Sequence, residues 1–291
     1  MTRSADAPRF LTTASKLTDA GIRSIKSAYM RPALRHVTAD RYLLPLREGG
    51  SLPGLIEAND LGTYVVKFRG AGQGPKALVA EVIAGELARV LGLPVPELVI
   101  VDLDATMAIS EPDQEVQDLL RASPGLNLGM DYLPGSLGLE RPEGIIGPEL
   151  AAQIIWFDAL VQNVDRSWHN PNLLSWHGKP FLIDHGAALY FHHNWSSARL
   201  AARRPYPKAA EHVLLSVAAP LPPVQEQLAS RVTAESLRAV TELVPDQWLQ
   251  GDDAFATVQL ARQAYVDVLL ARVADPGSWL DAVEVARAEH V

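Results

Sequence analysis

Short runs of apolar residues, separated by glycine and proline, dominate the first part of the chain. Segments 41–46 and 55–58 flank a glycine-rich stretch at 48–54, a pattern that predicts a β-hairpin with its tip in that stretch. Segment 62–68 is rich in β-branched and aromatic residues, and 97–102 contains four consecutive apolar residues. Both segments therefore predict further strands.

The spacing of apolar residues changes to about 3.6 in two later segments. This spacing predicts a helix over 76–91, where Leu78 and Leu87 fall on one face, and Gly92 follows as a stop signal. The same spacing predicts a second helix over 149–162. The apolar segment 126–133 lies between the two helices and predicts a strand, whereas 110–125 is polar and gives no clear prediction.

Beyond residue 133 the pattern is mainly helical. A short hairpin is predicted over 173–183, and the chain from 224 onward is expected to be mostly helix, with a long periodic segment at 254–273. Prolines between 205 and 223 predict an irregular stretch within 200–250. The predicted order is strands, one helix, more strands and then mainly helices. This segregation of strands and helices is typical of an α+β fold.

Composition narrows the class of protein. The chain has 291 residues and no cysteine, which excludes disulfides, thiolate metal sites and cysteine nucleophiles and suits a cytoplasmic protein. We find no apolar run long enough to span a membrane and no secretory signal. Net charge is −8; residues 1–36 carry seven basic and two acidic side chains, so the remainder carries −13. An acidic body gives no strong nucleic-acid signal.

A lysine and a glutamate supply the first candidate chemistry. Lys67 lies in an otherwise apolar strand segment, and Glu81 follows 14 residues later in the predicted helix. A buried lysine needs a partner or a ligand, and a Lys–Glu pair of this kind directs the ammonium toward ATP phosphates in kinases. Glu86 is a rival partner that we expect to face solvent. The alternative for Lys67 is a strand-face lysine with its ammonium in water.

The polar loop 163–172 supplies the second group. It contains Asp165 and Arg166, followed by Asn170 and Asn172 directly before an apolar strand. Kinases use such a loop to place a carboxylate near the accepting hydroxyl and an amide oxygen on Mg²⁺. Taken alone, the loop is equally well explained as an ordinary polar turn.

A third segment favours the kinase interpretation of that loop. An apolar strand ends at Asp184, 19 residues after Asp165, and His185 and Gly186 follow. This is the position and shape of the metal-binding Asp-Phe-Gly segment of kinases, with histidine in place of phenylalanine. A chance occurrence of all three groups in this order is much less probable than that of any one.

Two other kinds of site have little support. The glycines at 70–74 follow a strand and precede a helix, but they lack the Gly-x-Gly-x-x-Gly spacing of dinucleotide sites and the Gly-Lys-Ser/Thr ending of a P-loop. Five of the eight histidines fall within 169–193, yet no His-Glu-x-x-His occurs, so a metal hydrolase is not favoured.

These segments resemble the HipA-like kinases, specifically short, stand-alone bacterial members. The resemblance extends over about residues 41–193 and rests on the strand with Lys67, the helix with Glu81, the Asp131-Tyr-Leu-Pro-Gly segment, the Asp165 loop and Ile183-Asp-His-Gly. It implies a bilobal protein-kinase-like fold. An antiparallel sheet with one main helix at 37–133 would cover ATP, and a mostly helical lobe at 134–291 would follow. Residues 1–36 are expected to form a basic helical extension.

The resemblance also implies roles for individual residues. Lys67 would contact phosphate, Glu81 would position it, Asp165 would act as catalytic base with Arg166 as a further catalytic residue, and Asp184 would bind Mg²⁺ together with a loop asparagine. The usual spacing favours Asn170, whereas the junction with the following strand favours Asn172, which we prefer. The expected nucleotide contacts are Gly49, Gly50 and Ser51 at the hairpin tip and Met130, Asp131, Tyr132 and Leu133 near adenine.

The expected function is therefore Mg²⁺-dependent transfer of the γ-phosphate of ATP to a hydroxyl, with Ser or Thr of a protein as the default acceptor of the family. A small-molecule or lipid-head-group kinase would carry the same motifs. A nucleotide-binding pseudokinase that acts as a scaffold is a further alternative, because the spacing of the asparagine is altered. The sequence does not indicate which acceptor is used.

Overall fold

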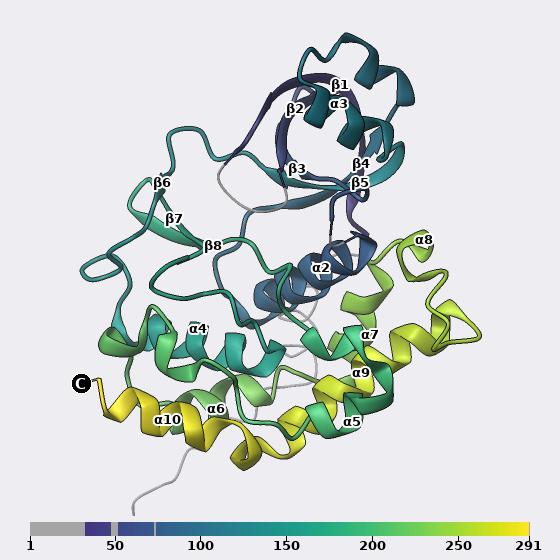
Figure 1. Ribbon diagram of the computed structural model, residues 1–291. Helices are drawn as coiled ribbons and strands as arrows, with labels where there is room; N and C mark the ends of the chain where they lie inside the picture. Colours follow the sequence, from purple (N-terminus) through teal and green to yellow (C-terminus); the bar gives the residue numbers. More distant parts are fainter. Residues whose placement is uncertain (1–32, 48–51, 73, 291) are drawn as a thin grey trace, which may run out of the picture.

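The computed structural model describes residues 33–47, 52–72 and 74–290 of the chain. Strands form a barrel at one end of the molecule and helices fill the other end, with one long helix between them (Figure 1). Five strands make up the barrel in the order β1-β2-β3-β5-β4. Their bounds are β1 (Arg35–Pro45), β2 (Gly54–Ala58), β3 (Thr63–Lys67), β4 (Leu98–Leu103) and β5 (Gly125–Asp131).

The barrel closes through one parallel pair. Neighbouring strands are antiparallel except β1 and β4, which run parallel from Arg35 opposite Val99 to Thr38 opposite Asp102. The expected sheet of antiparallel strands is therefore correct for four of the five pairings. The parallel pairing joins segments about sixty residues apart, and local apolar patterns do not report such pairings.

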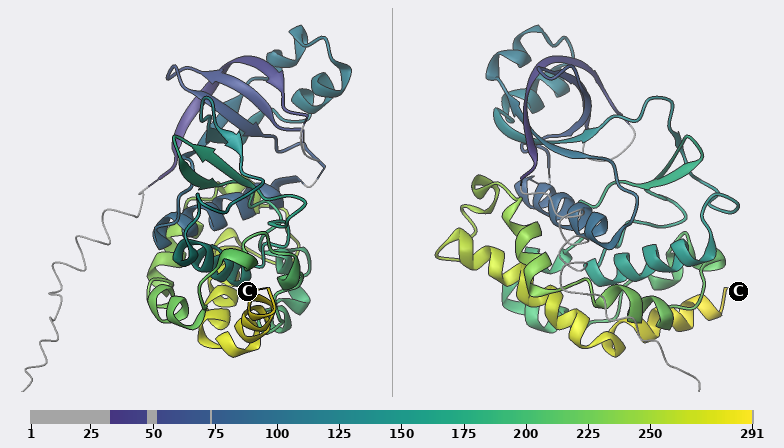
Figure 2. Two further views of the ribbon diagram at one scale, coloured as in Figure 1. Left: turned by 90° about the vertical axis from the view of Figure 1, so that its left-hand side faces the viewer. Right: turned by 180° about the vertical axis from the view of Figure 1, so that it is seen from behind.

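Strand β4 is buried on both faces and joins the two cores. Val99 and Val101 face the barrel interior, whereas Leu98 and Ile100 belong to the second, larger core. That core includes the long helix α2 (Gly74–Leu91), which lies between the barrel and the other helices (Figures 1 and 2). Helix α2 therefore packs against Leu98 and Ile100 of the barrel as well as against the helices at the other end of the molecule.

A small helical insertion covers the barrel between β4 and β5. It consists of η1 (Ala105–Ser110) and α3 (Gln114–Arg121), which the polar pattern of 110–125 did not predict. The Asp113 side chain caps α3 by accepting hydrogen bonds from the N–H groups of the first turn. Val116 and Leu120 of α3 join the barrel core.

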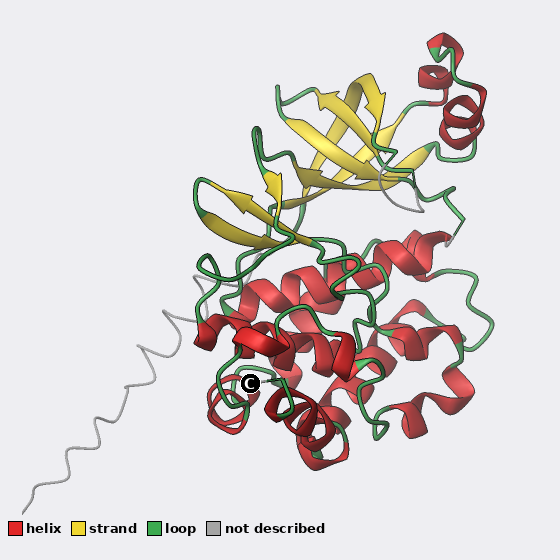
Figure 3. Cartoon of the chain, turned by 60° about the vertical axis from the view of Figure 1, so that its left-hand side comes forward, coloured by secondary structure: helices red, strands yellow, loops and turns green. Residues whose placement is uncertain are grey.

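Helices predominate over strands after β5, as the sequence predicts (Figure 3). A three-stranded sheet has the strand order β6-β7-β8. Strand β6 precedes helix α4 along the chain, and β7 and β8 follow it. The elements are β6 (Leu137–Gly138), α4 (Pro148–Val161), β7 (Leu173–Trp176), β8 (Lys179–Leu182), α5 (Ala198–Ala201), α6 (Pro222–Ala229), α7 (Ala234–Glu242), α8 (Asp246–Leu249), α9 (Val258–Ala274) and α10 (Leu280–Ala288). Single turns of 3₁₀ helix, η2 (Tyr190–His193), η3 (Trp195–Ser197), η4 (Ala209–Glu211), η5 (Leu215–Val217) and η6 (Pro276–Ser278), join them.

Several sequence expectations need correction. Residues 1–32 of the expected N-terminal extension lie outside the described residues, and Arg35 and His36 belong to strand β1 rather than to a helix. The irregular stretch expected within 200–250 lies between α5 and α6, and two prolines occupy the first turn of α6, where they are tolerated. Helix α9 begins later than residue 254 because the Thr257 side chain caps it. Within the described residues, no helix has the length and apolar character needed to cross a membrane.

Candidate active site

The Lys67 ammonium joins three elements at the boundary between the barrel and the helices. It donates to Oε1 of Glu81 on α2 in a very short contact, and to Oδ1 of Asp184 after β8 at 2.6 Å. The side chains of Lys67 and Glu81 are only 20% and 6% exposed. The predicted Lys67–Glu81 pair is therefore present, and a second carboxylate, 117 residues from the lysine, completes it.

Glu81 also holds the segment that follows Asp184. Its second oxygen, Oε2, accepts a hydrogen bond from the backbone N–H of His185 at 2.9 Å. A Cβ at Gly186 would lie 3.1 Å from Oε1 of Glu81, so the glycine allows this close approach. Burial raises the pKa of Glu81, but Lys67 and His185 lower it by more, so the carboxyl is ionised.

Asp184 lies at a sharp change of direction after β8, with a φ of 56° in the left-handed region. Burial raises the pKa of its carboxyl, and nearby Glu81 adds to this effect while Lys67 opposes it. Its side chain is nevertheless 41% exposed. Asp184 is thus the most accessible member of the Lys67, Glu81 and Asp184 cluster.

Asp165 lies in the loop after α4, with both candidate asparagines beside it. The side-chain amide of Asn170 donates to Oδ2 of Asp165 at 2.9 Å, and that of Asn172 donates to the same oxygen at 3.3 Å. Asn170 is exposed, whereas Asn172 is 9% exposed and directly precedes β7. The structure therefore brings both alternatives to Asp165 and does not choose between them.

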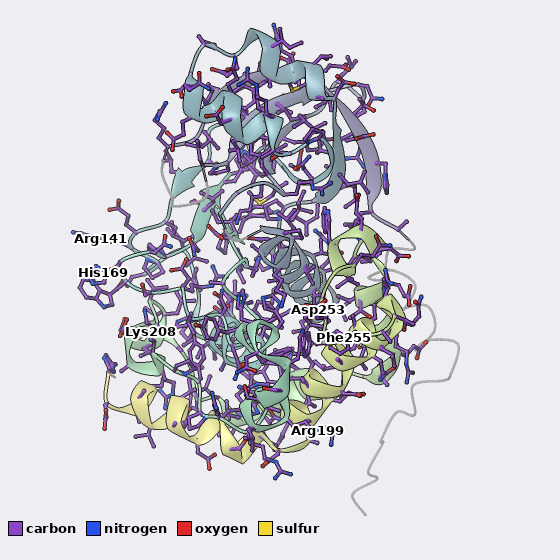
Figure 4. The ribbon with its side chains drawn as sticks, turned by 45° about the vertical axis from the view of Figure 1, so that its right-hand side comes forward. Arg141, His169, Arg199, Lys208, Asp253 and Phe255 are labelled. Atoms are coloured by element: carbon purple, nitrogen blue, oxygen red, sulfur yellow. The ribbon has the colours of Figure 1, made fainter. Side chains whose placement is uncertain are left out.

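A cavity of about 150 Å³ lies between the Lys67–Asp184 pair and Asp165. Its lining includes Lys67, Asp165, Asp184 and Gly186, together with residues at the start of α2. A larger cavity of about 420 Å³ lies near the α8–α9 connection, on the side where Figure 4 labels Asp253 and Phe255. None of the predicted site residues lines that larger cavity, so the candidate chemistry belongs to the smaller one.

Two backbone N–H groups of the segment expected near adenine already have partners within the protein. The N–H groups of Asp131 and Tyr132 already donate to the carbonyls of Glu97 and Thr63. Leu133 is buried and Tyr132 is 37% exposed, but neither they nor Met130 line the cavity beside Lys67. Gly49, Gly50 and Ser51, expected at the hairpin tip, lie outside the described residues.

Comparison with known proteins decides the family. The sequence model of the HipA-like kinases matches residues 42–282, which is most of the chain. The chain belongs to the HipA-like kinase family. It is therefore a phosphotransferase, as the sequence predicted. No curated protein sequence matches it.

Two solved structures show a distant likeness to this chain. The Helicobacter pylori proinflammatory kinase CtkA is 13% identical, with a TM-score of 0.48, over 86% of this chain and 98% of that chain. The Golgi casein kinase with Mn/ADP bound is 13% identical, with a TM-score of 0.43, over 94% of this chain and 77% of that chain. The family membership rests on the sequence match rather than on these distant likenesses.

One predicted catalytic residue of the HipA-like kinase has a different place. Arg166 is 1% exposed, and its guanidinium pairs with Asp158 of α4 instead of lining the cavity. This burial corrects the expectation that Arg166 acts directly at the catalytic centre. Its sequence position beside Asp165 suggested the cavity, but the side chain extends into the core.

Sequence reasoning missed two residues beside Arg166. Asp158 is fully buried on α4, and His212 contacts its Oδ2 through Nε2 at 3.1 Å. The signal in the sequence is a lone aspartate among the apolar positions of a helix. Glu86 was expected to face solvent but is 2% exposed and pairs with Arg89.

Proposed function

We propose that this HipA-like kinase transfers the γ-phosphate of ATP to a hydroxyl group in a Mg²⁺-dependent reaction, with a Ser or Thr of a protein as the expected acceptor. The observation that carries the proposal is the Lys67 ammonium between Glu81 and Asp184, at the wall of a cavity that Asp165 also lines. Kinases need this combination of a phosphate-binding cation, a metal-binding carboxylate and a second carboxylate for the acceptor.

Lys67 is assigned to phosphate binding, with Glu81 as its anchor. Burial lowers the pKa of Lys67, but Glu81 and Asp184 raise it by more, so the ammonium stays charged. Glu81 is nearly inaccessible, whereas Asp184 is 41% exposed. We therefore expect incoming phosphate to compete with Asp184 for Lys67, while Glu81 keeps its contact. The cavity of about 150 Å³ is smaller than ordinary ligand pockets, so it accommodates only part of a nucleotide.

Asp165 is assigned to the acceptor hydroxyl. Both asparagine amides donate to Oδ2 of this carboxylate. Oδ1 has no hydrogen bond to the residues that the structure describes, which leaves it for an acceptor O–H. A carboxylate in this position orients the hydroxyl and accepts its proton as the oxygen attacks phosphorus.

The oxygen donors of Asp184 and of the loop beside Asp165 suit Mg²⁺. Asp184 offers a carboxylate, and Asn170 or Asn172 offers an amide oxygen, both of which are ligands that this hard cation prefers. No cluster of three or more histidine or acidic side chains able to hold a metal occurs in the described part of the chain. Protein groups would thus supply few ligands, and phosphate oxygens and water the others. Bound Mg²⁺ would offset negative charge on the phosphates.

Thermal unfolding tests nucleotide binding. Mg²⁺–ATP at about 100 times its dissociation constant should stabilise the wild type by about 2.7 kcal/mol, which is a rise of several degrees in Tm. Asp184→Asn should remove the Mg²⁺-dependent part of this rise, and Asp253→Asn, a matched change at an exposed position, should not. A wild type that Mg²⁺–ATP does not stabilise would contradict the proposed function.

The two asparagines can be separated by their Mg²⁺ requirement. Asn172→Gly should raise the Mg²⁺ concentration needed for stabilisation by ATP about tenfold or more, and Asn170→Ala should leave it within about twofold. Glycine is the appropriate replacement at 172 because Asn172 has a φ of 49°. The measurement is a Mg²⁺ titration of Tm at saturating ATP. The reverse pattern would assign the metal to Asn170.

A further inference from the structure

A fully buried ion pair lies beneath the catalytic loop. Nε of Arg166 donates to Oδ2 of Asp158 at 2.6 Å, and both side chains have no solvent exposure. Burial raises the pKa of Asp158, but Arg166 and His212 lower it by more, to about 2. Burying two charges costs several kcal/mol in desolvation, so such a pair is weak evidence for a role in stability alone.

Another nitrogen of the same guanidinium joins two segments of the candidate site. Nη1 donates to the carbonyl of Asn172 in a very short contact and lies 3.4 Å from the carbonyl of Ile183. The N–H of Ile183 in turn donates to the same Asn172 carbonyl at 3.1 Å. One guanidinium nitrogen thus contacts the backbone of Asn172 and of the residue before Asp184.

His212 fixes the other side of the buried pair. Nδ1 of His212 accepts the N–H of Leu214 at 3.2 Å, so the ring proton is on Nε2, which donates to Oδ2 of Asp158 at 3.1 Å. His212 also forms a β-bridge with Ser167, next to Arg166 in the loop. Asp158 is therefore held between Arg166 and a segment that arrives about fifty residues later in the chain.

We propose that Arg166 is a positioning residue whose guanidinium, anchored by Asp158 and His212, sets the placement of Asn172 relative to Asp184. The proposal rests on the proposed function in one respect, namely that these two residues face the metal. A planar guanidinium can bond Asp158 and the two carbonyls at once because its donors point in fixed directions. A lysine ammonium on a shorter reach cannot replace all of these contacts.

Arg272 offers a matched control. Its side chain is also fully buried and donates to backbone carbonyls, among them those of Ala159 and Leu160 at the end of α4. Its hydrogen bonds do not reach the Asp165 loop or the Asp184 segment. Arg→Lys at either position removes a buried guanidinium from the same core, but only Arg166→Lys loosens the candidate metal ligands.

The test uses the full chain and two readouts. The first is hydrogen–deuterium exchange in peptides covering 163–176 and 179–190, where Arg166→Lys should increase exchange roughly tenfold and Arg272→Lys should leave exchange unchanged. The second is the Mg²⁺ titration of Tm with ATP, where Arg166→Lys should require about tenfold more Mg²⁺. A loss of Tm in Arg166→Lys with both peptides exchanging as in the wild type would overturn the proposal.

His212 provides a further comparison that does not remove a charge. His212→Gln can keep the N–H donor to Asp158, whereas His212→Asn can keep only the acceptor for Leu214. His212→Gln should therefore exchange like the wild type in the 163–176 peptide, and His212→Asn should exchange faster. The opposite order would show that Asp158 does not need this anchor. If Mg²⁺–ATP fails to bind the wild type, the proposed function fails, while the exchange readout still decides whether Arg166 positions these segments.

Discussion

Asp165→Asn should lower the rate of phosphate transfer by about 100- to 10,000-fold, the usual contribution of a positioned proton acceptor. The asparagine has nearly the same shape, and its carbonyl oxygen can still accept from the amides of Asn170 and Asn172. It cannot accept the acceptor's proton. Because Asp165 is outside the proposed metal ligands, the stabilisation by Mg²⁺–ATP should stay close to that of the wild type.

The measurement is transfer of γ-labelled phosphate from ATP to a degenerate peptide library with one fixed Ser or Thr, together with release of ADP. Asp253→Asn serves as the control because its carboxylate is exposed and does not line the cavity with Lys67. Equal transfer rates for Asp165→Asn and the wild type would contradict the assignment of Asp165. Release of ADP without labelled peptide would instead indicate another acceptor class.

Lys67→Met should destabilise the protein by about 3–5 kcal/mol, since it leaves a buried carboxylate without its cation. The Glu81 side chain is 6% exposed, and Asp184 would then contribute a second uncompensated negative charge. Stabilisation by Mg²⁺–ATP should fall as well, because the phosphate contact is lost. The double variant Lys67→Met with Glu81→Gln should recover much of the stability but none of the ATP effect.

Replacing Lys67 by Met should reverse the sign of the contribution that Glu81 makes to the pH dependence of the free energy of unfolding. In the wild type its pKa lies below the ordinary value of 4.5. The unfolded chain therefore binds more protons near pH 4, and Glu81 makes the free energy of unfolding rise with pH there. In Lys67→Met, burial raises the pKa of Glu81 above the unfolded value. The folded state then binds more protons, and the free energy of unfolding falls as pH rises above the ordinary pKa of 4.5.

The measurement is the free energy of unfolding in denaturant, from pH 4 to 8, for Lys67→Met and for the double variant. The difference between the two free energies isolates the contribution of Glu81 from that of the other carboxylates. A difference that does not change with pH would mean that Glu81 finds another cation when Lys67 is absent. His185, whose Nδ1 lies 3.8 Å from Oε2 of Glu81, is the nearest candidate. Adding His185→Gln to both variants should then restore the expected pH dependence of the difference.

Local patterns predicted most elements of this fold correctly because periodicity reports which face of a segment is buried. The strand with Lys67, helix α2 and helix α4 are where the spacing of apolar residues placed them. The closure of the barrel by β1 and β4 was not predicted, because a pairing between distant segments depends on the other strands being in place. Helix α3 was missed since its short amphipathic pattern lies within a polar segment.

The candidate site divides in the same way. The pairing of Lys67 with Glu81 was predictable from the strand-to-helix spacing, and the positions of Asp165 and Asp184 from motif order. The inward direction of Arg166 was not, because it depends on Asp158 and His212, which lie 8 residues before and 46 residues after it in the sequence. A charged residue on an apolar helix reveals that a partner exists, but not which one.

The parallel pairing of β1 with β4 has a consequence for how other proteins can approach this kinase. Strand β4 has β1 on one side and β5 on the other from Val99 to Asp102, so it offers no free row of backbone N–H and C=O groups there and an extended peptide cannot add to it as a further strand. The small sheet β6-β7-β8 ends in strands β6 and β8 instead. An acceptor segment bound in extended form would therefore have to pair with a strand other than β4, such as β6 or β8, or make its contacts through side chains.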